Sequence, residues 1–220
     1  MGGKVKKREQ AFIRDKAERL ARSKQKASKP QAAKLAEKAE RILDFSTAAS
    51  KPRLILKTSP GVAASFAVEG FEVRQGGKSR ASSSAKLSIN DMGVGDSKKK
   101  FVTGVMELSV PVETKKMNAL EIKVKAEGIK SFNVAIYVKQ GKGMIGWSKT
   151  GLKVGEEFSN VTIPFADFDM WNYDIGKKGY TFPDKWAPPE RIETLSFYLR
   201  PKNLADGKRG TLWIGAVALR

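Results

Sequence analysis

The segment Phe158–Trp171, FSNVTIPFADFDMW, decides the fold class of this chain. Val161, Ile163 and Phe165 recur at every second position, which is the pattern of a strand with one buried face. Pro164 has no N–H to donate to a ladder, so it suits a strand end or an edge strand. The segment therefore predicts a strand of a β-sandwich that ends in an aromatic-lined corner.

Extended patterns of the same kind fill the chain from Arg53 onward. In FNVAIYV the apolar side chains alternate with a second set that consists of Asn133, Ala135 and Tyr137. Connections rich in Gly, Ser and Lys, such as GVGDSKKK, separate the segments. About ten short strands with such turns indicate an antiparallel sandwich or barrel. The predicted strands are Leu54–Lys57, Phe66–Arg74, Ala85–Ile89, Phe101–Val110, Ala119–Ala126, Phe132–Lys139, Met144–Trp147, Val161–Phe165, Ile192–Leu199 and Thr211–Leu219.

Before Pro52 the periodicity is helical. Apolar residues between Ala32 and Leu43 recur three and four positions apart, and Pro30 suits the first turn of a helix that begins there. A narrower apolar stripe precedes it, from Ile13 to Leu20. We therefore predict a basic arm of two helices, residues 1–52, followed by a mainly β domain, residues 53–220.

The formal charge of +19 favours an anionic partner such as a nucleic acid or an acidic glycan. The first 53 residues carry 16 lysines and arginines against 6 acidic residues, so the arm is the electrostatic centre. Two interpretations stay open: a solvated helix face, and an arm that binds polyanions. The residues predicted to bind a polyanion are Lys4, Lys6, Lys7, Arg8, Arg14, Arg22, Lys24 and Lys26.

The chain has no cysteine and no histidine, which excludes Ser–His and Cys–His catalytic sites, disulfides and the commonest zinc ligands. Carboxylates such as Asp167 and Asp169 could pair for glycoside hydrolysis, but acidic residues at turns are usually solvated, so we predict no enzyme activity and no cofactor. No apolar run has membrane length, and no signal peptide follows the charged start, MGGKVKKREQ. The compartment stays open; a cytoplasmic location is expected if the N-terminus is complete.

One arrangement of segments is distinctive. FAVEGFEV, LEIKVKA, FNVAIYVK, the corner VTIPFADF, PPERIETLSFYL and the last strand GTLWIGAVAL follow one another between Phe66 and Leu219. This order resembles the galactose-binding-like jelly roll of non-catalytic carbohydrate-binding modules, and that of complex I intermediate-associated proteins. The resemblance implies a jelly-roll β-sandwich that binds a carbohydrate. Such modules often place an acidic residue in the last strand beside a calcium ion; this strand has none, so we predict no metal site.

Aromatic residues are dense between Trp147 and Trp186, where prolines and polar residues surround them. Flat rings stack on sugar rings, and on bases where lysines accompany them. Some of these rings could instead close the sandwich edge as core. Our hypothesis is a non-catalytic module that binds a carbohydrate, with an anionic glycan as one candidate ligand. The alternative is a structural protein of a larger assembly whose arm binds nucleic acid or a partner. The predicted ligand-binding residues are Trp147, Trp171, Tyr173, Tyr180 and Trp186.

Overall fold

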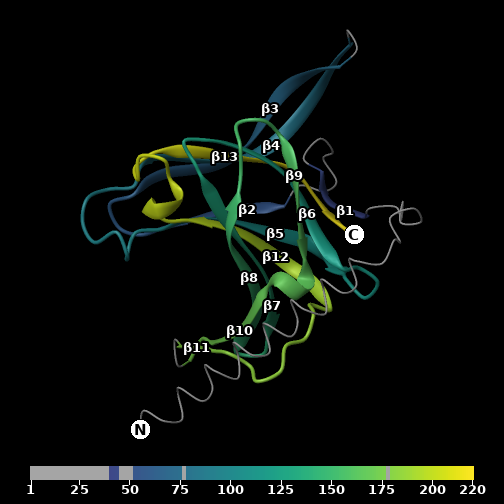
Figure 1. Cartoon of the computed structure of the whole chain (residues 1–220). Coiled ribbons are helices and arrows are strands. Elements are labelled where there is room, and N and C mark those ends of the chain that lie inside the picture. The colour runs from purple at the N-terminus through teal and green to yellow at the C-terminus, as the bar shows by residue number, and fades with distance from the viewer. Residues whose placement is uncertain (1–39, 45–51, 76–77, 177–178) are drawn as a thin grey trace.

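The computed structural model describes residues 40–44, 52–75, 78–176 and 179–220, and these form two antiparallel sheets packed face to face (Figure 1). The first sheet has the order β3 (Ala63–Gln75), β4 (Lys78–Asp91), β13 (Gly210–Leu219), β6 (Ala119–Glu127) and β9 (Ser159–Pro164), and β1 (Glu40–Asp44) also pairs with β13. The second has the order β11 (Gly179–Thr181), β10 (Asp169–Asp174), β8 (Gly143–Lys153), β7 (Ser131–Gln140), β12 (Arg191–Leu199), β5 (Val102–Glu113) and β2 (Arg53–Thr58).

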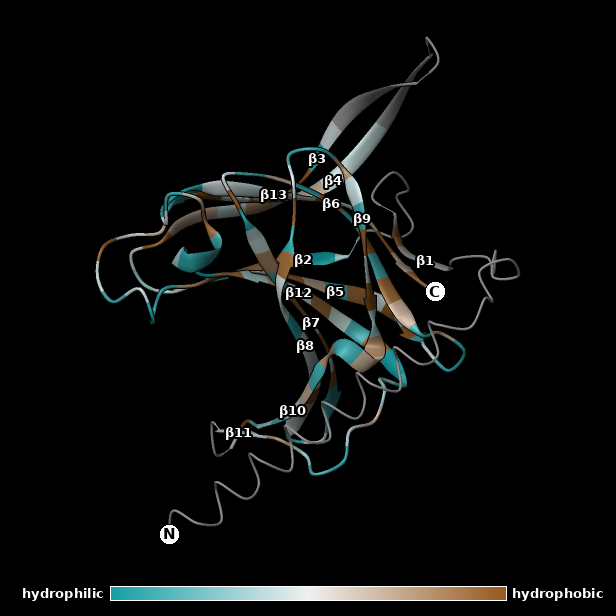
Figure 2. Cartoon of the chain, in the orientation of Figure 1, coloured by the Kyte–Doolittle hydropathy of each residue, from teal (hydrophilic) through white to brown (hydrophobic). Residues whose placement is uncertain are grey.

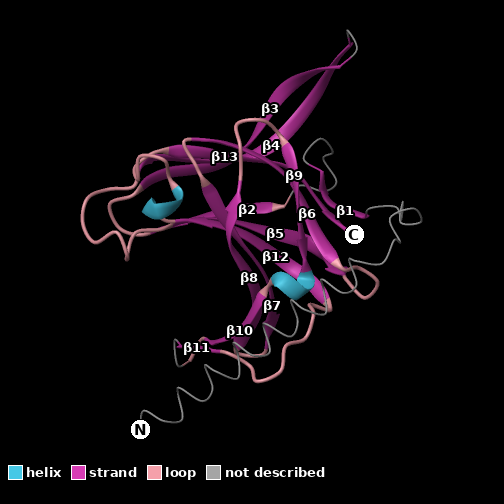
Figure 3. Cartoon of the chain, viewed as in Figure 1, coloured by secondary structure: helices cyan, strands magenta, loops and turns pink. Residues whose placement is uncertain are grey.

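Among the described residues the only helical turns are two short 3₁₀ segments, η2 (Phe165–Asp167) and η3 (Pro201–Asn203) (Figure 3). The prediction of a mainly β antiparallel sandwich is confirmed. None of the described residues belongs to a helix long and apolar enough to cross a membrane.

The core lies between the two sheets. Hydrophobic and hydrophilic residues alternate along many of the strands (Figure 2), and the apolar side chains that face the opposite sheet form the core. Ile163 and Phe165 are 1% and 3% exposed, and Val161 packs beside them, as the opening segment predicts. Full burial of such a side chain contributes about 1.5–3 kcal/mol, so this register is strongly specified.

The helical prediction is wrong at Glu40–Asp44, which forms strand β1. β4 pairs with only the first half of β13, up to Ile214, whereas β1 pairs with the second half, from Ala216 to Leu219. Leu43 enters the core with 1% exposure. An open edge on β13 would leave backbone groups without partners, and this tertiary pairing overrides the helical periodicity. The rest of the two-helix arm, with all eight predicted polyanion-binding residues, lies outside the described residues.

The predicted strands Phe66–Arg74 and Ala85–Ile89 leave residues 75–84, QGGKSRASSS, as a connection, yet most of this segment belongs to β4, which begins at Lys78. β3 and β4 pair over their whole length, whereas β13 joins β4 only at Ala85–Ile89. The far half of this hairpin therefore extends beyond the sandwich (Figure 1).

Candidate functional site

The outer face of the second sheet carries a cluster of aromatic side chains. Tyr137 of β7 lies opposite Gly146 of β8, and Gly146 lies opposite Trp171 of β10. Directly opposed residues share a face of a sheet, so Tyr137 and Trp171 flank Gly146 on one side. The neighbouring pair, Ile136 and Trp147, faces the core.

Gly146 allows the Trp171 indole to lie against the sheet. A Cβ atom added to Gly146 would stand 2.1 Å from Cζ2 of Trp171 and 2.4 Å from Cε2 and Cη2, a separation that real Cβ atoms do not show. Glycine inside a strand often marks such a close approach. The missing side chain at Gly146 thus makes room for the ring.

Four rings form a continuous group across β7, β10 and β11. The Tyr137 and Trp171 centroids are 6.3 Å apart, those of Trp171 and Tyr180 are 5.4 Å apart at 75°, and those of Tyr173 and Tyr180 are 4.8 Å apart. These separations lie within the range of favourable aromatic pairs. Tyr180 is 65% exposed and the other three are half-buried. We refer to Tyr137, Trp171, Tyr173 and Tyr180 as the aromatic face.

Buried polar and small side chains lie beside the aromatic face on the same side of the sheet, toward β12; Thr194 and Ser196 are each 5% exposed. Thr194 is opposite Tyr137, Ser196 is opposite Ala135, and Tyr198 follows two positions later. Burial raises the pKa of Tyr137 to about 12, with the Glu107 carboxylate adding to the shift and a hydrogen bond to Ser196 opposing it. At neutral pH Tyr137 is therefore an uncharged ring that carries a hydrogen-bonding hydroxyl.

A hollow of about 550 Å³ lies where β8, β10 and β11 end. Tyr173 and Tyr180 line it together with Lys142, Met144 and Asp174. Aromatic rings beside charged and amide groups are the usual lining of a small-molecule site.

The structure brings together three of the five residues predicted to bind ligand: Trp171, Tyr173 and Tyr180. It places Trp147 in the core, 4% exposed, with its Nε1 donating to the carbonyl of Ala187 at 2.7 Å. Trp186 packs against the core as well, and its Nε1 donates to the carbonyl of Phe168 at 3.1 Å. Neither ring belongs to the aromatic face.

Sequence reasoning missed Tyr137 and Tyr198 as members of this surface. The signal for Tyr137 was its phase, because it alternates with Phe132, Val134 and Ile136, which face the core. The order of the strands is needed to show that the outward-facing residues of β7 lie near Trp171.

The carboxylates considered for catalysis do not form a comparable cluster. Asp167 lies 3.8 Å from the ammonium of Lys149. Within the described part of the chain, no group of three or more acidic residues could hold a metal ion. Glu69, on the first sheet, accepts hydrogen bonds from Lys86 and Trp213 at 3.1 and 3.2 Å, and the Lys86 bond is the main cause of its lowered pKa.

Solved structures resemble this sandwich. The family 11 carbohydrate-binding module of the cellulosomal cellulase Lic26A-Cel5E of Clostridium thermocellum superposes with a TM-score of 0.52 at 14% identity, over 82% of this chain and 93% of the module. The chain has the jelly-roll fold of such modules. A family 30 carbohydrate-binding module matches less well, with a TM-score of 0.43 at 14% identity over 76% of this chain and 98% of the module. No protein-family model and no curated protein sequence matches the chain.

Proposed function

We propose that this chain is a non-catalytic module that binds a glycan on the aromatic face. The observation that carries the proposal is the group of four contacting rings, set around Gly146 on one outer face of the sandwich. The resemblance of the fold to a carbohydrate-binding module supports it.

Sugar rings present apolar C–H surfaces that pack on aromatic faces, while their hydroxyls need hydrogen-bonding groups at the edge. The aromatic face offers both. The Trp171 indole and the Tyr180 ring supply apolar area, and the tyrosine hydroxyls supply donors and acceptors. The arrangement suits a ligand that is apolar on its faces and polar around its rim.

The aromatic face itself carries little charge, because Tyr137 stays protonated to about pH 12. Stacking there should therefore depend weakly on salt, since screening acts only between charges. The +19 net charge favours a glycan that also has acidic groups, and those groups require a separate contact with cations.

Titration calorimetry with soluble neutral and sulfated glucans tests the proposal. Trp171→Ala and Tyr180→Ala should each weaken binding about tenfold, or about 1.4 kcal/mol, without unfolding the domain. Trp213→Ala is the matched control. Trp213 is half-buried on the outer face of the first sheet, where the Lys86 and Lys125 ammonium groups lie 5.6 and 4.5 Å from its ring. A loss of glucan binding in Trp213→Ala but not in Trp171→Ala would place the glycan site on the first sheet and refute the proposal.

A further inference from the structure

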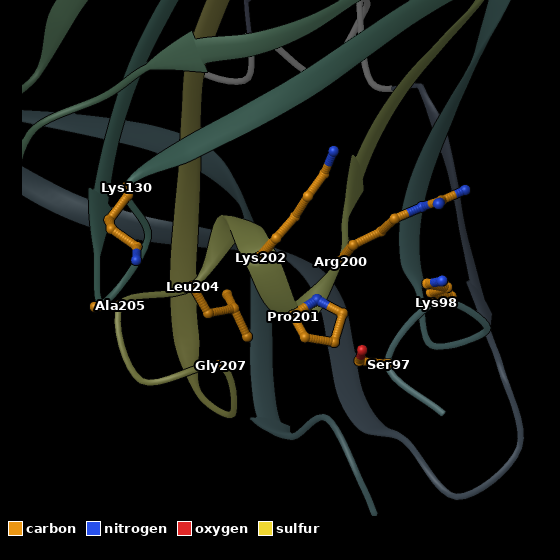
Figure 4. A pocket seen from close by; sticks show the side chains of 9 residues that line it. All are labelled: Ser97, Lys98, Lys130, Arg200, Pro201, Lys202, Leu204, Ala205 and Gly207. Carbon is orange, nitrogen blue, oxygen red and sulfur yellow. The ribbon is translucent and has the colours of Figure 1, made fainter. Parts of the chain in front are cut away.

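A hollow of about 530 Å³ at one end of the sandwich is lined by four cationic side chains: Lys98, Lys130, Arg200 and Lys202. Figure 4 shows Lys130 on one side of η3 and Lys98 on the other, with Arg200 and Lys202 between them. No carboxylate lines this hollow, and no ion pair found among the described residues involves any of the four. We refer to it as the basic hollow.

Two buried asparagines fix the loop that presents Arg200 and Lys202. Asn133 and Asn203 are each 2% exposed, and the Asn133 Nδ2 donates to the Asn203 Oδ1 at 3.2 Å. The same oxygen accepts from the backbone N–H of Arg200 at 2.9 Å, while the Asn203 Nδ2 donates to the Ser131 hydroxyl at 3.0 Å. Buried polar groups with satisfied partners hold a backbone in one arrangement.

Backbone contacts hold Lys130 beside this loop. The N–H of Lys130 donates to the carbonyl of Asn203, and the N–H of Ala205 donates to the carbonyl of Gly128, each at 2.8 Å. Ile129 and Leu204 form a β-bridge between these two contacts. The backbone therefore holds Lys130 beside the loop that carries Arg200 and Lys202.

Strand β12 runs from the aromatic face to the basic hollow. Along β12, Thr194 lies opposite Tyr137, and Tyr198 is on the same side at the far end, directly before Leu199 and Arg200. Six residues of extended chain from Thr194 to Arg200 span roughly 20 Å. Burial raises the pKa of Tyr198, and the guanidinium of Arg200, two positions further along the chain, opposes that rise.

We propose that the basic hollow binds the sulfate or carboxylate groups of the glycan that lies on the aromatic face. The guanidinium of Arg200 can bond an oxyanion through two parallel N–H groups, and the lysines add charge from the sides. A single compact hollow suits an isolated anionic substituent better than a nucleic-acid backbone, which needs a groove of cations along its length. The inference that the anionic group belongs to a glycan rests on the proposed function. The inference of an anion site does not.

The test uses a soluble neutral glucan, the same glucan after chemical sulfation, and inorganic sulfate. The variant Lys130→Gln/Lys202→Gln is compared with Lys115→Gln/Lys116→Gln, which removes the same charge from the β5–β6 connection, at the other end of β6. The first variant should bind the sulfated glucan at least tenfold more weakly, with a shallower dependence of log K on log salt, and should bind the neutral glucan unchanged. The control variant should retain most of its affinity for both.

Amide NMR with inorganic sulfate separates the two proposals. Amide chemical-shift changes centred on Lys130, Arg200, Ala205 and Gly207 in the whole protein would support the anion site, whether or not a glucan binds. Absence of glucan binding would refute only the proposed function. Equal weakening in both glutamine variants would overturn the inference in favour of a general charge effect. Tighter binding of an unstructured RNA than of the sulfated glucan at equal salt, lost in Lys130→Gln/Lys202→Gln, would overturn it in favour of nucleic acid.

Discussion

Gly146→Ala offers a direct test of how the aromatic face is built. The added Cβ would stand 2.1 Å from Cζ2 of Trp171, whereas ordinary contact begins at 3.4 Å. The indole must therefore rise from the sheet by about 1 Å or more. That movement changes its contacts with Tyr137 and Tyr180, at 6.3 and 5.4 Å, and tilts the surface on which a sugar would stack.

The expected loss of affinity follows from what stacking contributes. Removing an aromatic partner from a stacked base costs about 1–3 kcal/mol, and we take the same scale for a sugar ring. A binding surface displaced by 1 Å forfeits a large part of this, so Gly146→Ala should weaken binding about tenfold, or about 1.4 kcal/mol. Trp171→Ala should weaken it at least as much. In the background of Trp171→Ala, Gly146→Ala should have no further effect, because there is no ring to displace.

The assay is titration calorimetry with a soluble neutral glucan, combined with urea unfolding and tryptophan fluorescence. Gly155→Ala is the matched control, since a Cβ there meets nothing within 4 Å. It corrects for the loss of backbone freedom in the unfolded chain, about 0.4–1 kcal/mol. Overpacking at Gly146 should lower the free energy of unfolding by about 1–3 kcal/mol. Unchanged affinity in Gly146→Ala, together with a fluorescence change that reports a moved indole, would refute the role given to the position of Trp171.

Three further outcomes are expected. Trp147→Ala should lower the free energy of unfolding by about 3–5 kcal/mol in urea titrations and leave the glucan affinity of the folded protein unchanged; a loss below 1 kcal/mol would contradict its core position. Leu43→Ala should lower it by about 2–5 kcal/mol, because β1 completes the core beside β13, and a neutral result would mean that β1 adds little. The pKa of Tyr137 rises from 10.0 to about 12 on folding, so between these values the unfolded state loses its proton first and stability falls as pH increases. Tyr137→Phe should flatten that slope in chemical unfolding at alkaline pH, and an unchanged slope would argue against the raised pKa.

The sequence predicted the strands with regular alternation well. Leu120, Ile122 and Val124 are all fully buried in β6, and the period-two rule identifies them directly. The strand Asp169–Asp174 was not predicted, because DMWNYD has polar residues on both faces and resembles a loop. In the structure it pairs with β8 over its whole length. Its strand character comes from the neighbouring ladder rather than from its own pattern.

The site was harder to predict than the fold because neighbouring residues of a strand face opposite sides of the sheet. In β8 the residues Gly146 and Trp147 are adjacent, so one faces outward and the other inward. The sequence marked Trp147 as a ligand residue because it is large and lies near other rings. The pairing with Ile136 and Met170 sends it to the core instead, and leaves the outer face at this position to a glycine. Only the register of β7, β8 and β10 shows that Gly146, and not Trp147, lies beside the rings of the aromatic face.

The two proposed contacts differ in how much order they require on binding. The rings of the aromatic face already contact one another, and each such pair contributes about 0.5–1.5 kcal/mol, so they are held in place before a ligand arrives. The lysines of the basic hollow are long and exposed, and each loses about 0.5–1.5 kcal/mol of rotamer freedom when it is fixed. Affinity for a neutral glycan should therefore come from the aromatic face and be nearly independent of salt. The basic hollow should act on selectivity, by favouring acidic glycans over neutral ones at low salt and losing that preference as the salt concentration rises.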